Sequence, residues 1–142
     1  MPLDNTWVEV SESALLGNLR GLKSLLSSGT SLMFVVKANG YGHGLAQVAD
    51  IAEQPASPVD SYGVHLPEDG VFLRQRGISK EIHILGYANE SQLEEIVLHD
   101  LSPVLTNSSL IPALANEAQR QKKSIRITLK CETGTHRQGL LP

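Results

Sequence analysis

Short apolar runs alternate along the chain with segments whose apolar residues recur every three or four positions. The runs predict five strands, over residues 32–36, 62–65, 82–85, 103–105 and 125–130. The helical spacing predicts helices over about 15–26, 43–53, 67–77, 89–99 and 109–122. Strands joined by helical crossovers of this length pair in parallel, so the pattern predicts an α/β fold of five βα units.

The boundaries of the predicted helices fall on residues that favour helix ends. Ser11 or Ser13 can accept a hydrogen bond from the first turn of the first helix, and Asn89 suits the same position before the fourth. Pro67 stands where a helix tolerates proline best, and Gly77 ends that helix. The predicted alternation of strands and helices is therefore supported by residues at the helix ends as well as by hydrophobic periodicity.

Composition excludes several classes of protein. Hydrophobic residues make up 41% of the chain and charged residues 19%, as in ordinary globular domains and unlike disordered ones. A net charge of −3 and 4% aromatic residues disfavour nucleic acid and anionic membranes as partners. No apolar run is long enough to cross a bilayer, and residues 1–4 lack the features of a signal peptide. The single cysteine, Cys131, cannot form an internal disulfide and suits a cytoplasmic protein.

Two groups of polar residues follow predicted strands. Lys37 comes directly after the first strand, and residues 130–137 end and follow the fifth. The carboxyl ends of parallel barrel strands meet at one rim, where function is usually found, so both groups are expected at that rim. A lysine at the end of a buried strand is costly unless the site uses it; the alternative is a packed stem with a solvated amine.

Three alternate glycines, Gly40, Gly42 and Gly44, allow a tight turn and a close backbone approach before a helix. A dinucleotide-binding turn would also need an acidic residue at the end of the second strand. That strand ends instead at His65, and Asp60 precedes it. A dinucleotide site is therefore disfavoured.

Two longer motifs carry a resemblance to a known family. Residues 37–44, Lys-Ala-Asn-Gly-Tyr-Gly-His-Gly, resemble the cofactor-attachment signature of alanine racemases. Residues 130–139 resemble that family's Lys-x-Asp-Thr-Gly-Met-x-Arg-x-Gly, and shorter matches occur at 7–10, 18–19, 62–66, 73–74 and 84–86. The resemblance implies a partial (β/α)8 TIM-type barrel, with residues 1–142 forming an N-terminal segment that binds pyridoxal 5'-phosphate. A whole barrel takes roughly 250 residues, so later strands and a C-terminal β-domain are expected to be absent.

The resemblance also implies roles for individual residues. Lys37 would hold pyridoxal phosphate as a Schiff base and act as base on one face of the substrate. Tyr41 would contact the cofactor phosphate, and Arg137 the cofactor's phenolic oxygen and the substrate carboxylate. Lys130 matches a position that is carbamylated in many members; an anionic carbamate would hold Arg137 in place, whereas an unmodified lysine would repel it. The five histidines show no metal-ligand spacing, so no metal is expected.

The implied parent is a cytoplasmic homodimeric isomerase that interconverts L-alanine and D-alanine for peptidoglycan in the cell wall. The family's opposite-face tyrosine and main phosphate-binding strands lie outside residues 1–142, so this chain is expected to bind cofactor weakly and racemise little. Glu132 and Thr135 depart from the usual Asp and Met, which keeps serine or a broader amino-acid range open. Two further alternatives remain: a non-catalytic fragment that only associates, and a related barrel acting as a decarboxylase or cofactor carrier.

Overall fold

The computed structural model describes residues 6–141, so residues 1–4, on which the signal-peptide prediction depends, lie outside the described part. Five parallel strands form one sheet in the order β1-β2-β3-β4-β5. The strands are β1 Met33–Val35, β2 Ser61–Val64, β3 Glu81–Ile84, β4 Ser102–Leu105 and β5 Thr128–Leu129. The helices are α1 Glu12–Ser24, α2 Lys37–Tyr41, α3 Leu45–Ala52, α4 Pro67–Gln75, η1 Glu90–Gln92, α5 Leu93–Leu98 and α6 Ile111–Arg120.

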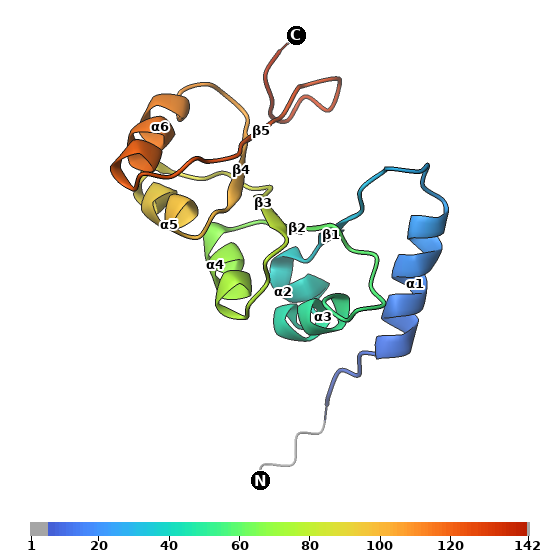
Figure 1. The fold of residues 1–142 in the computed structure, drawn as a ribbon. Helices are drawn as coiled ribbons and strands as arrows, with labels where there is room; N and C mark the ends of the chain where they lie inside the picture. Colours follow the sequence, from blue (N-terminus) through green and yellow to red (C-terminus); the bar gives the residue numbers. More distant parts are fainter. Residues whose placement is uncertain (1–5, 142) are drawn as a thin grey trace.

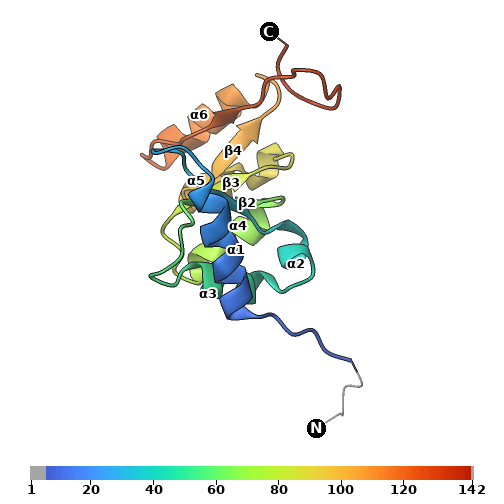
Figure 2. The same cartoon turned by 90° about the vertical axis from the view of Figure 1, so that its right-hand side faces the viewer.

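Helices α3 to α6 lie along the outer side of this curving row of strands, and α1 lies beside the β1 edge (Figure 1). Seen from that edge, the N-terminal segment and the loop after β5 lie at opposite ends of the molecule (Figure 2). Sequential parallel strands with helical crossovers confirm the predicted α/β class and the partial barrel. Within residues 6–141, no helix is both long and apolar enough to span a bilayer.

The main core lies between the strands and the outer helices. Tyr62 and Val64 of β2 are fully buried and stand in register with Ile82 and Ile84 of β3, which are fully buried too. Burying an aliphatic or aromatic side chain of this size stabilises the fold by about 1.5–3 kcal/mol each. This layer therefore provides most of the cohesion between the first three βα units.

On the opposite face of the sheet, side chains pack closely around Gly63. A Cβ atom on Gly63 would lie 2.9 Å from Leu85 Cδ1, 3.1 Å from Met33 Sδ and 3.2 Å from Val35 Cγ2. These distances are too short for ordinary contacts, so the space above Gly63 is already filled by side chains from β1 and from the end of β3. Gly63 thus belongs to the inner face, and Tyr62 and Val64 to the outer one.

Several predicted boundaries agree with the structure and one does not. Ser11 accepts from the Ala14 amide at the start of α1, and Asn89 forms a capping box with Gln92. The strand predicted over 125–130 is too long, because only Thr128–Leu129 pairs with β4. β5 is the last strand of the sheet and has one neighbour, so alternation alone does not supply partners for the rest of the run.

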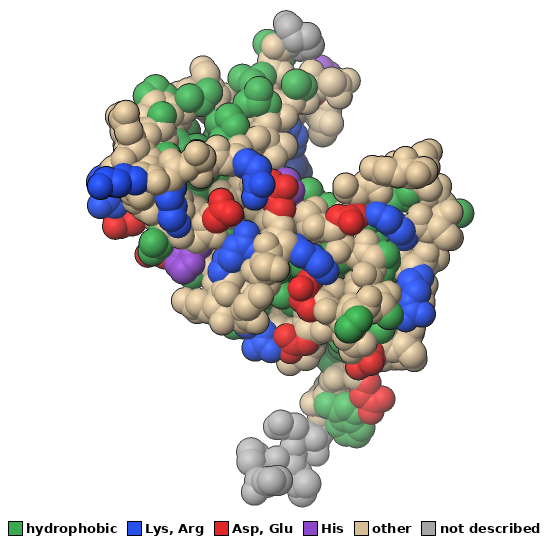
Figure 3. Space-filling model, viewed as in Figure 1, with side chains coloured by type: hydrophobic (Ala, Val, Ile, Leu, Met, Phe, Trp, Pro, Cys, Tyr) green, Lys and Arg blue, Asp and Glu red, His purple; other side chains and the backbone are tan. Residues whose placement is uncertain are grey.

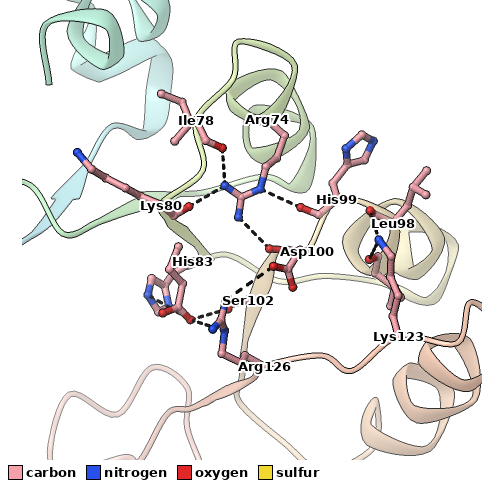
Figure 4. A network of polar contacts seen from close by, with 12 residues as sticks. Arg74, Ile78, Lys80, His83, Leu98, His99, Asp100, Ser102, Lys123 and Arg126 are labelled. Carbon is pink, nitrogen blue, oxygen red and sulfur yellow. Dashed lines mark hydrogen bonds and ion pairs between the residues drawn. The ribbon is translucent and has the colours of Figure 1, made fainter. Parts of the chain in front are cut away.

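Arg74 of α4 joins the two loops that lead into β3 and β4. Its guanidinium donates to the backbone carbonyls of Ile78, Lys80, His99 and Asp100, at 2.7, 2.6, 2.9 and 3.0 Å (Figure 4). One half-buried cation thereby satisfies four backbone carbonyls. The amino-terminal ends of these two strands, opposite the rim formed by their carboxyl ends, are fixed by this side chain.

Opposite charges lie next to each other across the middle of the face viewed in Figure 3. Arg126 lies 3.5 Å from Glu81 and 3.7 Å from Asp100, and Lys80 lies 2.8 Å from Glu53. Such partly exposed pairs each contribute about 0–1 kcal/mol. They fix the orientation of surface side chains more than they stabilise the fold.

Candidate active site

The chain leaves β1 through a left-handed turn. The φ angles of Ala38, Asn39, Gly40 and Tyr41 are 52°, 54°, 62° and 54°, so α2 is wound in the hand that L-residues avoid. This conformation costs roughly 1–2 kcal/mol for each non-glycine residue. Strain of this kind persists only where the surroundings enforce it, and it is concentrated at functional sites. The glycine pattern predicts a turn here, but it carries no signal that three non-glycine residues share the left-handed conformation.

Hydrogen bonds on both sides hold this turn. The Gly40 amide donates to the Val36 carbonyl at 2.9 Å, and the Gly44 amide donates to the Asn39 carbonyl at 2.9 Å. The side chain of Asn39 accepts from the Leu45 amide at 2.8 Å, which satisfies the first turn of α3. His43 Nδ1 lies 3.0 Å from the Gly40 carbonyl oxygen, so this side chain also contacts the turn.

The turn brings two of the predicted site residues together. Lys37 Nζ lies 6.0 Å from the centre of the Tyr41 ring, and Tyr41 is 59% exposed. Lys37 is half-buried and lines an open hollow. The hollow has a volume of about 440 Å³ and is lined by Lys37, Ala38, Asn39, His65, Leu66 and Asp69.

The second motif forms a closed loop after β5. The Glu132 amide donates to the Leu140 carbonyl at 2.8 Å, and the Leu140 amide donates to the Lys130 carbonyl at 2.7 Å. Between these ends, the Glu132 carboxylate accepts from the backbone amides of Gly134 and Arg137. Backbone hydrogen bonds, led by that from His136, lower the pKa of Glu132. Glu132 therefore ties the loop that carries Arg137.

The two motifs stand at different places on one rim. Lys37 follows β1 and Lys130 follows β5, which are the two edge strands of the sheet. All strands are parallel, so both motifs lie at carboxyl ends, as predicted. The structure groups Lys37 with Tyr41 at one edge and Lys130 with Arg137 at the other. His65, which lines the hollow beside Lys37, is missed by the motif reasoning, although its place directly after β2 marks it as a rim residue.

The residues present suit pyridoxal phosphate. Lys37 offers a primary amine for an aldehyde, Tyr41 an exposed hydroxyl for a phosphate, and Arg137 a permanent cation for a phenolate or carboxylate. Within the described residues, no three His, Cys, Asp or Glu side chains gather as metal ligands would.

The structure is a partial parallel barrel with a lysine directly after its first strand, at the rim where barrel enzymes carry their active sites. Comparison with known proteins narrows the class. Residues 10–142 match the family model described as alanine racemase, N-terminal domain. The chain therefore belongs to the alanine racemase family, as the sequence motifs predict.

Individual relatives agree with this assignment. The chain is 42% identical over 137 residues to an alanine racemase of Symbiobacterium thermophilum, covering 96% of this chain and 36% of that protein. It is 35% identical to alanine racemase 1 of Caldanaerobacter subterraneus, covering 96% and 34%. The structure of alanine racemase from Clostridium difficile 630 superimposes with a TM-score of 0.83 at 28% identity, covering 88% of this chain and 32% of that one. The chain thus spans about a third of the length of the relatives it matches.

Proposed function

We propose that residues 1–142 are the cofactor-attaching barrel segment of a pyridoxal-phosphate-dependent alanine racemase. The observation that carries the proposal is the strained turn after β1, which sets the Lys37 amine beside the Tyr41 ring at an open rim. When bound, pyridoxal phosphate supplies an aldehyde that links to an amine and a ring that withdraws electrons from the substrate α-carbon.

In this proposal each named residue has one task. Lys37 Nζ would hold the cofactor aldehyde, and as a free amine it would take or return the proton on one face of the α-carbon. The Tyr41 hydroxyl would donate to the phosphate, and Arg137 would bind the phenolic oxygen and the substrate carboxylate. Lys130, as a carbamate, would hold Arg137 by opposite charge; an intact mass of native protein without the added carbon dioxide would contradict that part.

The parent enzyme is proposed to be a cytoplasmic homodimer that supplies D-alanine for peptidoglycan. Racemisation needs a proton donor on each face of the α-carbon, and Lys37 serves one face. We therefore expect residues 1–142 alone to racemise alanine far more slowly than a full-length enzyme. An assay of D- and L-alanine exchange that shows full-length turnover for this chain would contradict this expectation.

A broader substrate range is the second candidate. Thr135 stands in the Arg137 loop where the family motif has methionine, and the chain is 31% identical to a protein named serine/alanine racemase from Enterococcus gallinarum, covering 19% of that protein. The smaller, polar Thr135 side chain suits a hydroxyl-bearing substrate at this loop. Equal affinity for alanine and serine would support this candidate over strict alanine specificity.

The test compares three forms of the chain: the parent, Lys37→Arg and Lys122→Arg. Each is incubated with pyridoxal phosphate and reduced with borohydride, and its intact mass is then measured by mass spectrometry. Lys122 is an exposed lysine after α6 and serves as the matched control. We expect one cofactor per chain in the parent and in the Lys122 variant, and none in the Lys37 variant. Equal labelling of all three forms would contradict the proposal.

A further inference from the structure

His65 stands at the rim beside Lys37, and none of the roles proposed above uses it. The hydrogen-bond ladder of the sheet continues past β2 to reach it: the Leu85 amide donates to the Val64 carbonyl at 2.8 Å, and the Gly86 amide donates to the His65 carbonyl at 3.1 Å. The backbone of His65 is therefore part of the rigid sheet, and its side chain starts from a fixed point.

The direction of the imidazole follows from two observations. Tyr62 and Val64 point to the outer core, so alternation along the strand puts His65 on the inner face with Gly63. A Cβ atom on Gly86 would lie 2.9 Å from both Cε1 and Nδ1 of the His65 ring, so the ring rests directly against Gly86. His65 is an exposed residue and lines the same hollow as Lys37.

We propose that His65 is a further contact of this site, whose imidazole donates a hydrogen bond to an anionic oxygen of the molecule held at Lys37. The inference rests on the proposed function, because it needs a molecule bound there. An imidazole is a good donor to carboxylate, phenolate or phosphate oxygens, and a ring supported by Gly86 loses little rotational freedom on binding.

The opposing charge in the hollow is Asp69. Burial, followed by the neighbouring Glu68, raises the pKa of Asp69, while the backbone amide of Leu66 donates to its carboxylate. The charge of His65 acts in the opposite direction and lowers the pKa of Asp69, so the imidazole also lies near this carboxylate. Asp69 is tied to the start of α4, and an anion would avoid that side of the hollow and lie toward Lys37 and His65, which line it together.

Three sources could supply the anionic oxygen: the cofactor phosphate, the cofactor phenolate and the substrate carboxylate. Affinities are measured by spectral titration with pyridoxal phosphate, with pyridoxal, and with alanine added to the cofactor-loaded chain. If replacing His65 weakens the affinity for pyridoxal phosphate but not for pyridoxal, the contact is to the phosphate. If the affinity for pyridoxal falls as well, the contact is to the phenolate. If only the affinity for alanine falls, the contact is to the substrate carboxylate.

The variants are His65→Ala, His65→Gln and His99→Gln. His99 lies at the opposite end of the barrel segment, 3.1 Å from Glu95, and is the matched control. Loss of one hydrogen bond to a charged group corresponds to an affinity about tenfold to a hundredfold weaker in His65→Ala. His65→Gln keeps an N–H donor and should stay within about threefold of the parent. The urea midpoints should match the parent's, since the ring is exposed.

The outcomes separate the two proposals. If the parent forms no adduct at Lys37, the proposed function fails, and the role of His65 fails with it. If the parent forms the adduct and His65→Ala binds all three ligands as tightly as the parent, only the role of His65 is overturned. An equal loss in His99→Gln would also overturn it, because the effect would then not belong to the rim.

Discussion

Removing the Arg74 side chain is expected to destabilise the chain far more than removing its near neighbour Arg76. Four backbone carbonyls accept from the Arg74 guanidinium. At about 0.5–1.5 kcal/mol for each net hydrogen bond, and with water able to reach part of the half-buried group, Arg74→Ala should lower the free energy of unfolding by about 2–4 kcal/mol. Arg76 pairs with the exposed Asp50 and lies over the Phe72 ring, so Arg76→Ala should cost about 1 kcal/mol or less.

Urea unfolding followed by circular dichroism measures both variants. With a slope of about 2 kcal/mol per M urea, the Arg74→Ala midpoint should fall by about 1–2 M and the Arg76→Ala midpoint by about 0.5 M or less. The slope should stay unchanged if the folded state is the same. Equal midpoints for the two variants would refute the reasoning, because they would show that water replaces the guanidinium at all four carbonyls without cost.

Two further predictions concern the two motif loops. Ala38→Gly should raise the free energy of unfolding by about 1 kcal/mol, and Gly42→Ala should lower it by about as much, since φ is 52° at Ala38 and 86° at Gly42; urea midpoints that move the other way would contradict the left-handed turn. The lowered pKa of Glu132 means that its hold on the loop is complete above its ordinary value of 4.5 and is lost as pH falls through the lower folded value. The amide chemical shifts of Gly134 and Arg137 should report that titration in the parent and should not titrate in Glu132→Gln. A titration midpoint above pH 4.5 for these amide shifts would contradict the lowered pKa of Glu132.

The strands that the sequence predicts well are those whose side chains are buried on both faces. Tyr62 and Val64 pack under helices while Gly63 is covered from β1 and β3, so the apolar run and the buried strand coincide. The starts of helices are predicted well where a side chain makes the capping hydrogen bond, as at Ser11 and Asn89. In both cases the deciding interaction is local or depends only on burial.

The features that the sequence does not predict leave no mark on hydrophobic spacing or on helix-end residues. The left-handed conformation of Ala38 and Asn39 is imposed by hydrogen bonds to flanking elements and has no signature in hydrophobic spacing. Arg74 finds carbonyls up to 26 positions away, and no pattern in α4 indicates them. His65 shares a hollow with Lys37 only because β1 and β2 are neighbours. Register and topology, which become known only in the fold, decide the contacts of Arg74 and His65.

The most direct test of the central claim is the distribution of pyridoxal phosphate over the lysines of the parent chain. The protein is saturated with cofactor, reduced with borohydride, digested and mapped by mass spectrometry. The account predicts that the label is concentrated on Lys37, because the strained turn presents that amine at the open rim. Label spread evenly over the surface lysines, with Lys37 no more reactive than Lys122 or Lys123, would contradict it.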